Sequence, residues 1–120
     1  IYINLSLVSD AEIKEINDET RGKNTVTDVL SFPMEENIRK GDFDDFLPEL
    51  DVGDILICKS VCEEQARDHN IGFMDEFVHL FMHGFLHCWG YDHELNDEED
   101  KLMRGLEEKL VKKISEFKNA

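Results

Sequence analysis

Three histidines in the second half of the chain, His83, His87 and His93, are separated by three and then five residues. His83 and His87 are four residues apart, so on a helix their imidazoles project from the same side and can coordinate one metal ion. Gly90 stands three residues after His87, where the chain must turn sharply to reach His93. This pattern predicts a helix through His83 and His87, followed at once by a tight turn.

The spacing H-x3-H-x5-H, with Gly90 at the turn, is that of a metzincin zinc site. Three neutral imidazoles leave a fourth tetrahedral position for water, as in a catalytic zinc site and unlike a closed structural one. Core histidines lining a buried helix are the simpler explanation, but three at a ligand spacing favour metal binding. We therefore predict one Zn²⁺ on His83, His87 and His93. His79, one turn earlier, is expected to form a hydrogen bond and not to be a fourth ligand.

The residue after the first histidine narrows the reaction class. Zincin proteases carry a glutamate there as their general base, whereas this chain has Gly84. Phosphodiester hydrolysis has less need of such a general base, because the metal itself can activate water and polarise the phosphoryl oxygen. That reaction needs a nearby cation, and arginine suits a phosphate better than lysine. Arg21, in the short basic loop at 21–25, is the predicted catalytic residue.

The rest of the chain predicts an α+β fold. Apolar patterns and helix-capping residues predict strands at 1–8, 28–32 and 53–58, and helices at 10–20, 60–69, 75–89 and from 97 onward. Asp75 is the predicted cap of the helix at 75–89. This helix is apolar nearly all round, so it is expected to be buried at the centre. Residues 34–50 are acidic and irregular, which predicts a surface loop. The expected architecture is a small mixed β-sheet packed against helices, with the motif HGxxHxxGxxH on the central helix.

Composition limits the class of protein. Hydrophobic residues make up 41% and charged residues 34%, which excludes a disordered tail and fits one domain over residues 1–120. Neither a membrane span nor a signal peptide is apparent. The three cysteines, Cys58, Cys62 and Cys88, are an odd number and lack the spacing of a disulfide framework. A cytoplasmic protein with free thiols is therefore expected. Thirteen Lys and Arg against 28 Asp and Glu give a net charge of −15. An RNA substrate would therefore need a local cationic site.

Residues 83–93, HGFLHCWGYDH, resemble the signature of the YbeY proteins, bacterial metal-dependent single-strand endoribonucleases. The similarity covers about residues 1–110 and includes Arg21-Gly22-Lys23, TDVLSFP at 27–33, Gly53-Asp54-Ile55 and His79-Leu80. The resemblance implies a zinc site on His83, His87 and His93 and a functional arginine at Arg21. Members of this family usually have an extra strand and helix before the segment that matches Ile1, so we expect an N-terminal piece to be missing here.

The same resemblance implies maturation of ribosomal RNA, most notably the 3′ end of 16S rRNA, and a part in ribosome quality control. Single-stranded RNA, the ribosome or its small subunit, and associated proteins are the implied partners. Two features depart from the family pattern. The net charge of −15 contrasts with a groove described as positive, and Cys88-Trp89 replaces two aliphatic residues. We therefore expect the ribosome or a partner protein to present the RNA.

Two other functions stay open at this point. A ribosome-biogenesis binding module with a structural zinc site would unfold without metal and cut no RNA. A metallopeptidase would need a base from elsewhere in the chain, and Asp92 is a candidate. Asp92 is also a candidate to orient one of the histidines, as carboxylates do beside metal ligands, although a carboxylate at this position could equally face solvent.

Overall fold

Three strands and four helices make up residues 2–34, 51–91 and 94–118, the parts of the chain that the computed structural model describes. In chain order they are β1 (Tyr2–Val8), α1 (Asp10–Arg21), β2 (Val29–Pro33), β3 (Asp51–Cys58), α2 (Lys59–Asp68), α3 (Phe73–Cys88) and α4 (Asp97–Lys118). Each predicted strand and helix is confirmed, with ends shifted by one or two residues. The surface loop predicted at 34–50 lies, apart from Met34, outside the described residues. No helix in the described part is long and apolar enough to cross a membrane.

The sheet is mixed, as expected, with the strand order β1-β3-β2. β1 runs parallel to β3, whereas β2 is antiparallel to it, so that Ile55 of the central strand lies between Leu5 and Ser31. The fourth strand that we expected was one preceding Ile1. β3 carries the fully buried residues Val52, Ile55, Ile57 and Cys58, as expected for the central strand of a sheet that is covered on both faces.

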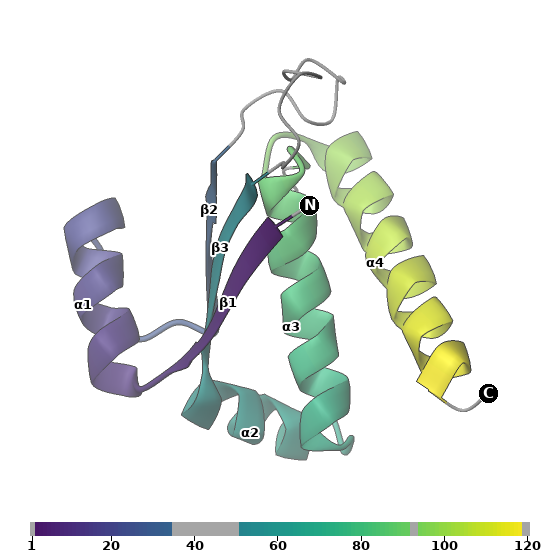
Figure 1. Cartoon of the computed structure of the whole chain (residues 1–120), viewed down its shortest axis with the longest axis horizontal. Coiled ribbons are helices and arrows are strands. Elements are labelled where there is room, and N and C mark those ends of the chain that lie inside the picture. Colours follow the sequence, from purple (N-terminus) through teal and green to yellow (C-terminus); the bar gives the residue numbers. More distant parts are fainter. Residues whose placement is uncertain (1, 35–50, 92–93, 119–120) are drawn as a thin grey trace.

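Helices cover the two faces of the sheet in separate layers (Figure 1). α1 packs on one face, where Ile13 is fully buried against a cluster that includes Val8 and Leu30. α3 packs on the other face, where Leu80 contacts Ile55 and its neighbours. α4 lies on the outer side of α3, and α2 joins the end of β3 to α3 (Figure 1). The predicted buried central helix is therefore α3.

Local signals explain where the helices begin and end. Ser9 caps α1 through a capping box with Glu12, and Gly22 ends the helix in the left-handed conformation at φ 67°. The predicted cap of α3 at Asp75 is wrong. The helix begins two residues earlier, after extended Gly72, so the carboxylate of Asp75 lies in the first turn and interacts with the helix dipole.

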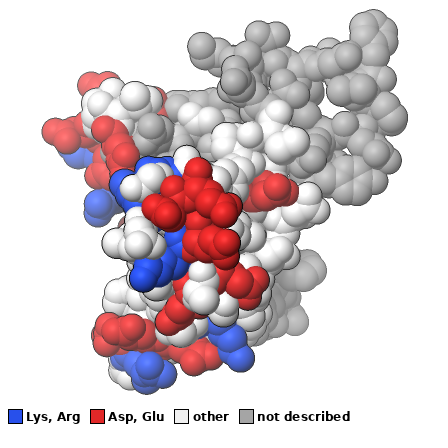
Figure 2. All heavy atoms as spheres, turned by 90° about the vertical axis from the view of Figure 1, so that its left-hand side faces the viewer, with Lys and Arg blue, Asp and Glu red and all other residues white. Residues whose placement is uncertain are grey.

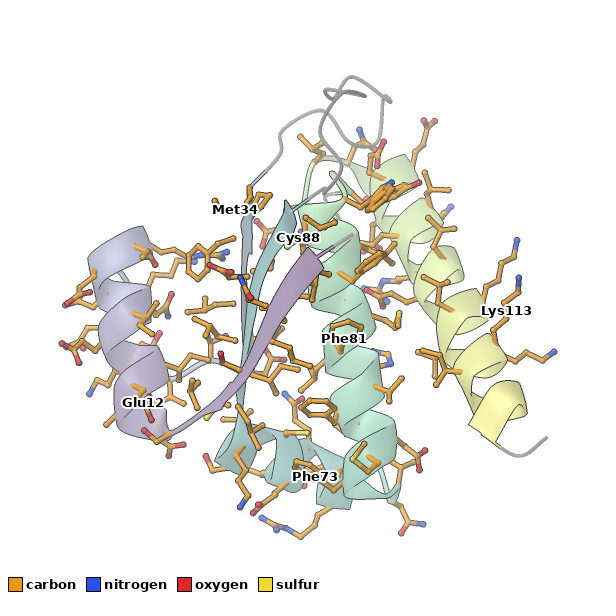
Figure 3. All side chains as sticks on the ribbon, viewed as in Figure 1. Glu12, Met34, Phe73, Phe81, Cys88 and Lys113 are labelled. Carbon is orange, nitrogen blue, oxygen red and sulfur yellow. The ribbon has the colours of Figure 1, made fainter. Side chains whose placement is uncertain are left out.

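Two glycines, one on α3 and one on β3, show how closely the last turns of α3 approach this strand. A Cβ atom added at Gly84 would lie 3.0 Å from the side chain of Ile55, and one added at Gly53 would lie 3.0 Å from the sulfur of Cys88. Cys88 is buried between α3 and the sheet (Figure 3) and packs there as a small apolar side chain. Position 84 therefore faces the sheet.

Two glycine-to-alanine substitutions test this approach. Gly84→Ala should lower the free energy of unfolding by about 1–2 kcal/mol, because the crowding of Ile55 outweighs the better helix propensity of alanine. Gly105→Ala in α4 is the matched control, since no atom lies within 4 Å of its added Cβ, and it should stabilise the protein by about 0.5–1 kcal/mol. Urea denaturation of both variants measures the difference. Equal stabilisation by both would contradict the close α3–β3 packing.

All three cysteines are buried, and none of them forms a disulfide. Burial, reinforced by the carboxylate of Glu76, raises the pKa of Cys62 to about 11. This thiol is therefore neutral at physiological pH and packs as a small apolar group. The expectation of free thiols is confirmed.

Candidate active-site cleft

A cleft of about 610 Å³ brings together the functional residues expected from distant parts of the sequence. Its lining residues come from the end of α1 and the loop after it, from β2, and from α3 and the turn after it: Arg21, Lys23, Thr27, Asp28, Val29, Ser31, Pro33, His83, His87, Gly90, Tyr91 and Glu94. Arg21 is thus in the same cleft as His83 and His87, although more than 60 positions separate them in the chain.

The two histidines on α3 lie next to each other. Their ring centroids are 4.7 Å apart and the rings meet edge to face at 75°. Both side chains are partly buried, and both line the cleft. The predicted helical spacing therefore does place both imidazoles on one wall.

A tight turn follows α3, as the position of Gly90 in the sequence predicted. Gly90 adopts φ 105°, a conformation that other residues rarely adopt, and its N–H donates to the carbonyl oxygen of His87 at 3.0 Å. The N–H of Tyr91 then donates to the carbonyl oxygen of Leu86, also at 3.0 Å. These bonds satisfy carbonyl groups at the helix end and reverse the chain toward the cleft, where Tyr91 and Glu94 both lie.

Among residues 2–34, 51–91 and 94–118, no group of three or more His, Cys, Asp or Glu side chains is arranged to hold a metal ion. His93, the third predicted ligand, and Asp92 lie outside those ranges. His83 and His87 are two adjacent imidazoles on one cleft wall, and imidazole nitrogen is a preferred zinc donor. These two imidazoles are therefore suitable as two of the protein ligands of a zinc ion.

Arg21 reaches the cleft from the last turn of α1. Gly22 ends the helix there, and its N–H and that of Lys23 donate to the carbonyl oxygens of Asp18 and Asn17. One guanidinium nitrogen of Arg21 lies 3.5 Å from the carbonyl oxygen of Ser31 on β2. Arginine carries several N–H donors in a fixed fork, so others remain to bind a phosphate group.

A buried asparagine anchors the basic loop. The side-chain amide of Asn17 is in the buried face of α1 and donates to the carbonyl oxygen of Thr25 at 3.0 Å. It also lies 3.4 Å from the hydroxyl of the same threonine. Because both ends of this loop are tied to α1, Arg21 and Lys23 are presented to the cleft by a fixed turn of the chain.

Several lining residues had no role assigned to them from sequence. Asp28 is the most constrained of these: its carboxylate accepts from the N–H of Val29 at 2.7 Å and from the amide of Gln65 at 3.3 Å. Lys23 lies beside the predicted Arg21, and Tyr91 and Glu94 follow the helix end. Their proximity to the motif residues was the available signal, but only the folded arrangement distinguishes them from other polar loop residues.

A second cavity of about 480 Å³ shares Asp28 and His83 with the cleft and extends between α2, α3 and α4. Two buried glutamates contact histidines there. Glu76, 3% exposed, lies 3.1 Å from Nδ1 of His69, whose own side chain is exposed. Glu107, 7% exposed, contacts Nδ1 of His83 and lies 3.9 Å from Nε2 of His79.

Charge around the cleft is mixed. Arg21 and Lys23 are opposed by Asp28 and Glu94 among its lining residues. On the face of the molecule that Figure 2 shows, basic side chains are interspersed with extensive acidic areas. The local cations are thus concentrated at the loop that carries Arg21, within a chain whose net charge is −15.

Comparisons with known proteins converge on one family. A family model described as Endoribonuclease YbeY matches residues 1–115. The protein named Endoribonuclease YbeY from Leptospira biflexa is 40% identical over 111 residues, 92% of this chain and 68% of that protein. The namesake from Staphylococcus epidermidis is 39% identical over 118 residues, 98% of this chain and 75% of that protein.

Structure comparison agrees with the sequence matches. The solution structure of TM1509 from Thermotoga maritima aligns with 99% of this chain and 72% of its own, with a TM-score of 0.66 and 35% sequence identity. The fold described above is therefore shared with a solved bacterial protein at a level of identity that supports common descent.

Proposed function

The chain belongs to the YbeY endoribonuclease family, and on that premise we propose that it is a zinc-dependent, single-strand-specific endoribonuclease of ribosomal RNA. Its substrate includes the 3′ end of 16S rRNA, which it matures, and it takes part in ribosome quality control. Residues 1–120 act as one metal-dependent hydrolase domain in the cytoplasm. No helix of the described part could span a membrane, in keeping with this proposal.

The observation that carries the proposal is the shared cleft. Arg21 from α1 and the pair His83 and His87 from α3 line the same 610 Å³ space. Hydrolysis of a phosphodiester requires a group that activates the attacking oxygen and a cation for the negative charge that develops on the phosphate. A cleft lined by adjacent imidazoles and an arginine supplies binding groups for both requirements.

His83, His87 and His93 are the residues that would hold the zinc ion. Zinc bound at such a site supplies Lewis-acid polarisation of a phosphoryl oxygen and lowers the pKa of water. Arg21 binds the scissile phosphate through its guanidinium fork and stabilises the charge that grows during the reaction. Asp92 is the candidate to orient one of these histidines, because carboxylates commonly bond the second ring nitrogen of a ligand histidine.

Arg21 and Lys23 are also the groups that would hold the RNA backbone. Two cations within an acidic protein give weak capture by diffusion, because phosphate contacts dominate nucleic-acid affinity and the global field repels the strand. RNA is therefore presented by the ribosome, its small subunit or an associated protein. Single strands suit the cleft because their backbone can bend to bring one phosphate between the arginine and the histidines.

The peptidase alternative is not favoured by the geometry at Gly84. Zincin peptidases carry their general base at this position, but here a Cβ would meet Ile55 of the sheet. The position therefore lacks both the carboxylate and the space for one.

Cleavage assays with metal removal test the proposed function. Zinc-loaded protein should cut an end-labelled single-stranded RNA, leave the same RNA in a full duplex intact, and leave casein intact. EDTA should stop the cleavage while the far-ultraviolet circular dichroism spectrum is retained, because the ion acts in catalysis and the apolar core holds the fold. Restored cleavage on adding zinc completes the expected result.

Other outcomes separate the alternatives. Unfolding on EDTA addition, with no RNA cut before it, would support the binding module with structural zinc. Zinc-dependent digestion of casein would support a peptidase. A cyclic phosphate at the product end would identify attack by the 2′-hydroxyl, whereas its absence would identify attack by water.

A further inference from the structure

Glu107 is a buried carboxylate on α4 that faces the candidate metal ligands. It is 7% exposed, and its Oε1 contacts Nδ1 of His83 on α3. The other carboxylate oxygen of Glu107 lies 3.9 Å from Nε2 of His79, which is one turn before His83 on α3. A carboxylate is rarely buried unless paired or hydrogen-bonded, so these histidines account for its position.

The place of Glu107 on α4 shows that the helix turns this carboxylate inward. Met103, four residues earlier and fully buried, lies on the same face of the helix. The next residue, Glu108, is exposed. Glu107 therefore occupies a position of the apolar stripe that would ordinarily hold a hydrophobic residue, which makes its contact with His83 the feature to explain.

The contact has a direct effect on the orientation of His83. A neutral imidazole carries its proton on one nitrogen and a lone pair on the other, and a carboxylate accepts from the protonated one. With Nδ1 facing Glu107, the lone pair belongs to Nε2. His83 also lines the cleft beside His87, so one side of its ring meets Glu107 and the ring borders the cleft.

We infer that Glu107 is a positioning residue for the metal site: it fixes the tautomer and rotation of His83 so that Nε2 is the metal-binding nitrogen. This inference rests on the zinc site of the proposed function and deepens it. Carboxylates that bond the second nitrogen of a ligand histidine strengthen metal binding, and their loss costs about 10–100-fold in affinity. α4 therefore contributes to the metal site although no ligand is expected from it.

A second contact between a buried glutamate and a histidine lies away from the cleft. Glu76 is buried to a similar degree, and its Oε2 lies 3.1 Å from Nδ1 of His69. Both residues of this pair line the second cavity, but neither lines the cleft. Replacing Glu76 removes a buried glutamate–histidine contact of the same chemistry without touching His83, which makes it the control for stability effects.

Zinc affinity, measured by competition with a chromophoric chelator on the full chain, tests the inference. Glu107→Met keeps the volume and removes the acceptor, so zinc should bind about 10–100-fold more weakly than to the wild type. Glu107→Gln keeps an oxygen acceptor but loses the negative charge, so its zinc affinity should lie between those of Glu107→Met and the wild type, and the spectrum of its cobalt(II) form should be altered. Glu76→Met should bind zinc as the wild type does. The visible absorption of the cobalt(II) form should change in Glu107→Met and remain unchanged in Glu76→Met.

Each result decides between this role and a structural one. Wild-type zinc affinity in folded Glu107→Met would overturn the inference while leaving the zinc site itself intact. If Glu107→Met does not fold, Glu107→Gln decides: an altered cobalt(II) spectrum would support the role, and an unaltered spectrum with unchanged affinity would overturn it. A wild-type chain that binds no zinc would overturn both the inference and the metal site of the proposed function.

Discussion

Replacing His87 with alanine is expected to abolish RNA cleavage. His87 lines the cleft beside His83, and its loss would remove one of the three ligands of the proposed zinc ion. Metal catalysis contributes several kilocalories per mole to such reactions, and ~4 kcal/mol corresponds to about a 10³-fold fall in rate. We expect a fall of at least that size, together with loss of tight zinc binding.

The measurement compares cleavage of a labelled single-stranded RNA by zinc-loaded wild-type and His87→Ala proteins purified side by side. His69→Ala is the matched control, because that histidine is exposed, lies outside the cleft and contacts Glu76. It should cut RNA at the wild-type rate. Equal cleavage by all three proteins would assign the activity to a contaminating nuclease or to another site.

Replacing Arg21 with alanine should lower the rate of RNA cleavage by about 10²–10³-fold and leave zinc affinity unchanged. The loss of one group that stabilises transition-state charge has an effect of this size in other enzymes. The guanidinium of Arg21 comes from α1 and contacts Ser31 of β2, whereas the two histidines are on α3, so the metal site should keep its affinity. This separation of rate from metal binding distinguishes Arg21 from His87.

Arg67→Ala is the control for the charge that is lost. Arg67 lies in the last turn of α2, as Arg21 lies in the last turn of α1, but it is not among the cleft residues. It should cut RNA at the wild-type rate. Arg21→Lys should be intermediate, because lysine keeps the charge and loses the fork of N–H donors. A wild-type rate in Arg21→Ala would exclude a catalytic role for this residue.

The helix-borne part of the site could be predicted from sequence because it depends on local geometry. His83 and His87 are four residues apart, and any α-helix places such residues on one side. Gly90 was predictable for the same reason, since the tight turn needs a backbone conformation that favours glycine. The family resemblance at 83–93, now supported by the family match, added the expected roles.

The contribution of other elements to the site could not be predicted this way. Nothing in the spacing of Glu107 shows that α4 brings it into contact with His83, and nothing in that of Asp28 shows that it lines the same cleft as His83. Both facts depend on how the layers pack. The start of α3 was misjudged for a related reason. Asp75 is a good capping residue, but extended Gly72 lets the helix begin earlier, and the carboxylate is equally favourable in the first turn.

The candidate site draws its groups from both sides of the sheet. Arg21 is carried by α1, which packs on one face, and the histidines are carried by α3, which packs on the other (Figure 1). A chain in which only one of these helices has packed on the sheet would hold only part of the proposed site. An RNA-degrading enzyme is a hazard to the transcripts around it while it is being made. On the proposed function, we therefore expect that a nascent chain cannot cleave RNA until both helices have packed on the sheet.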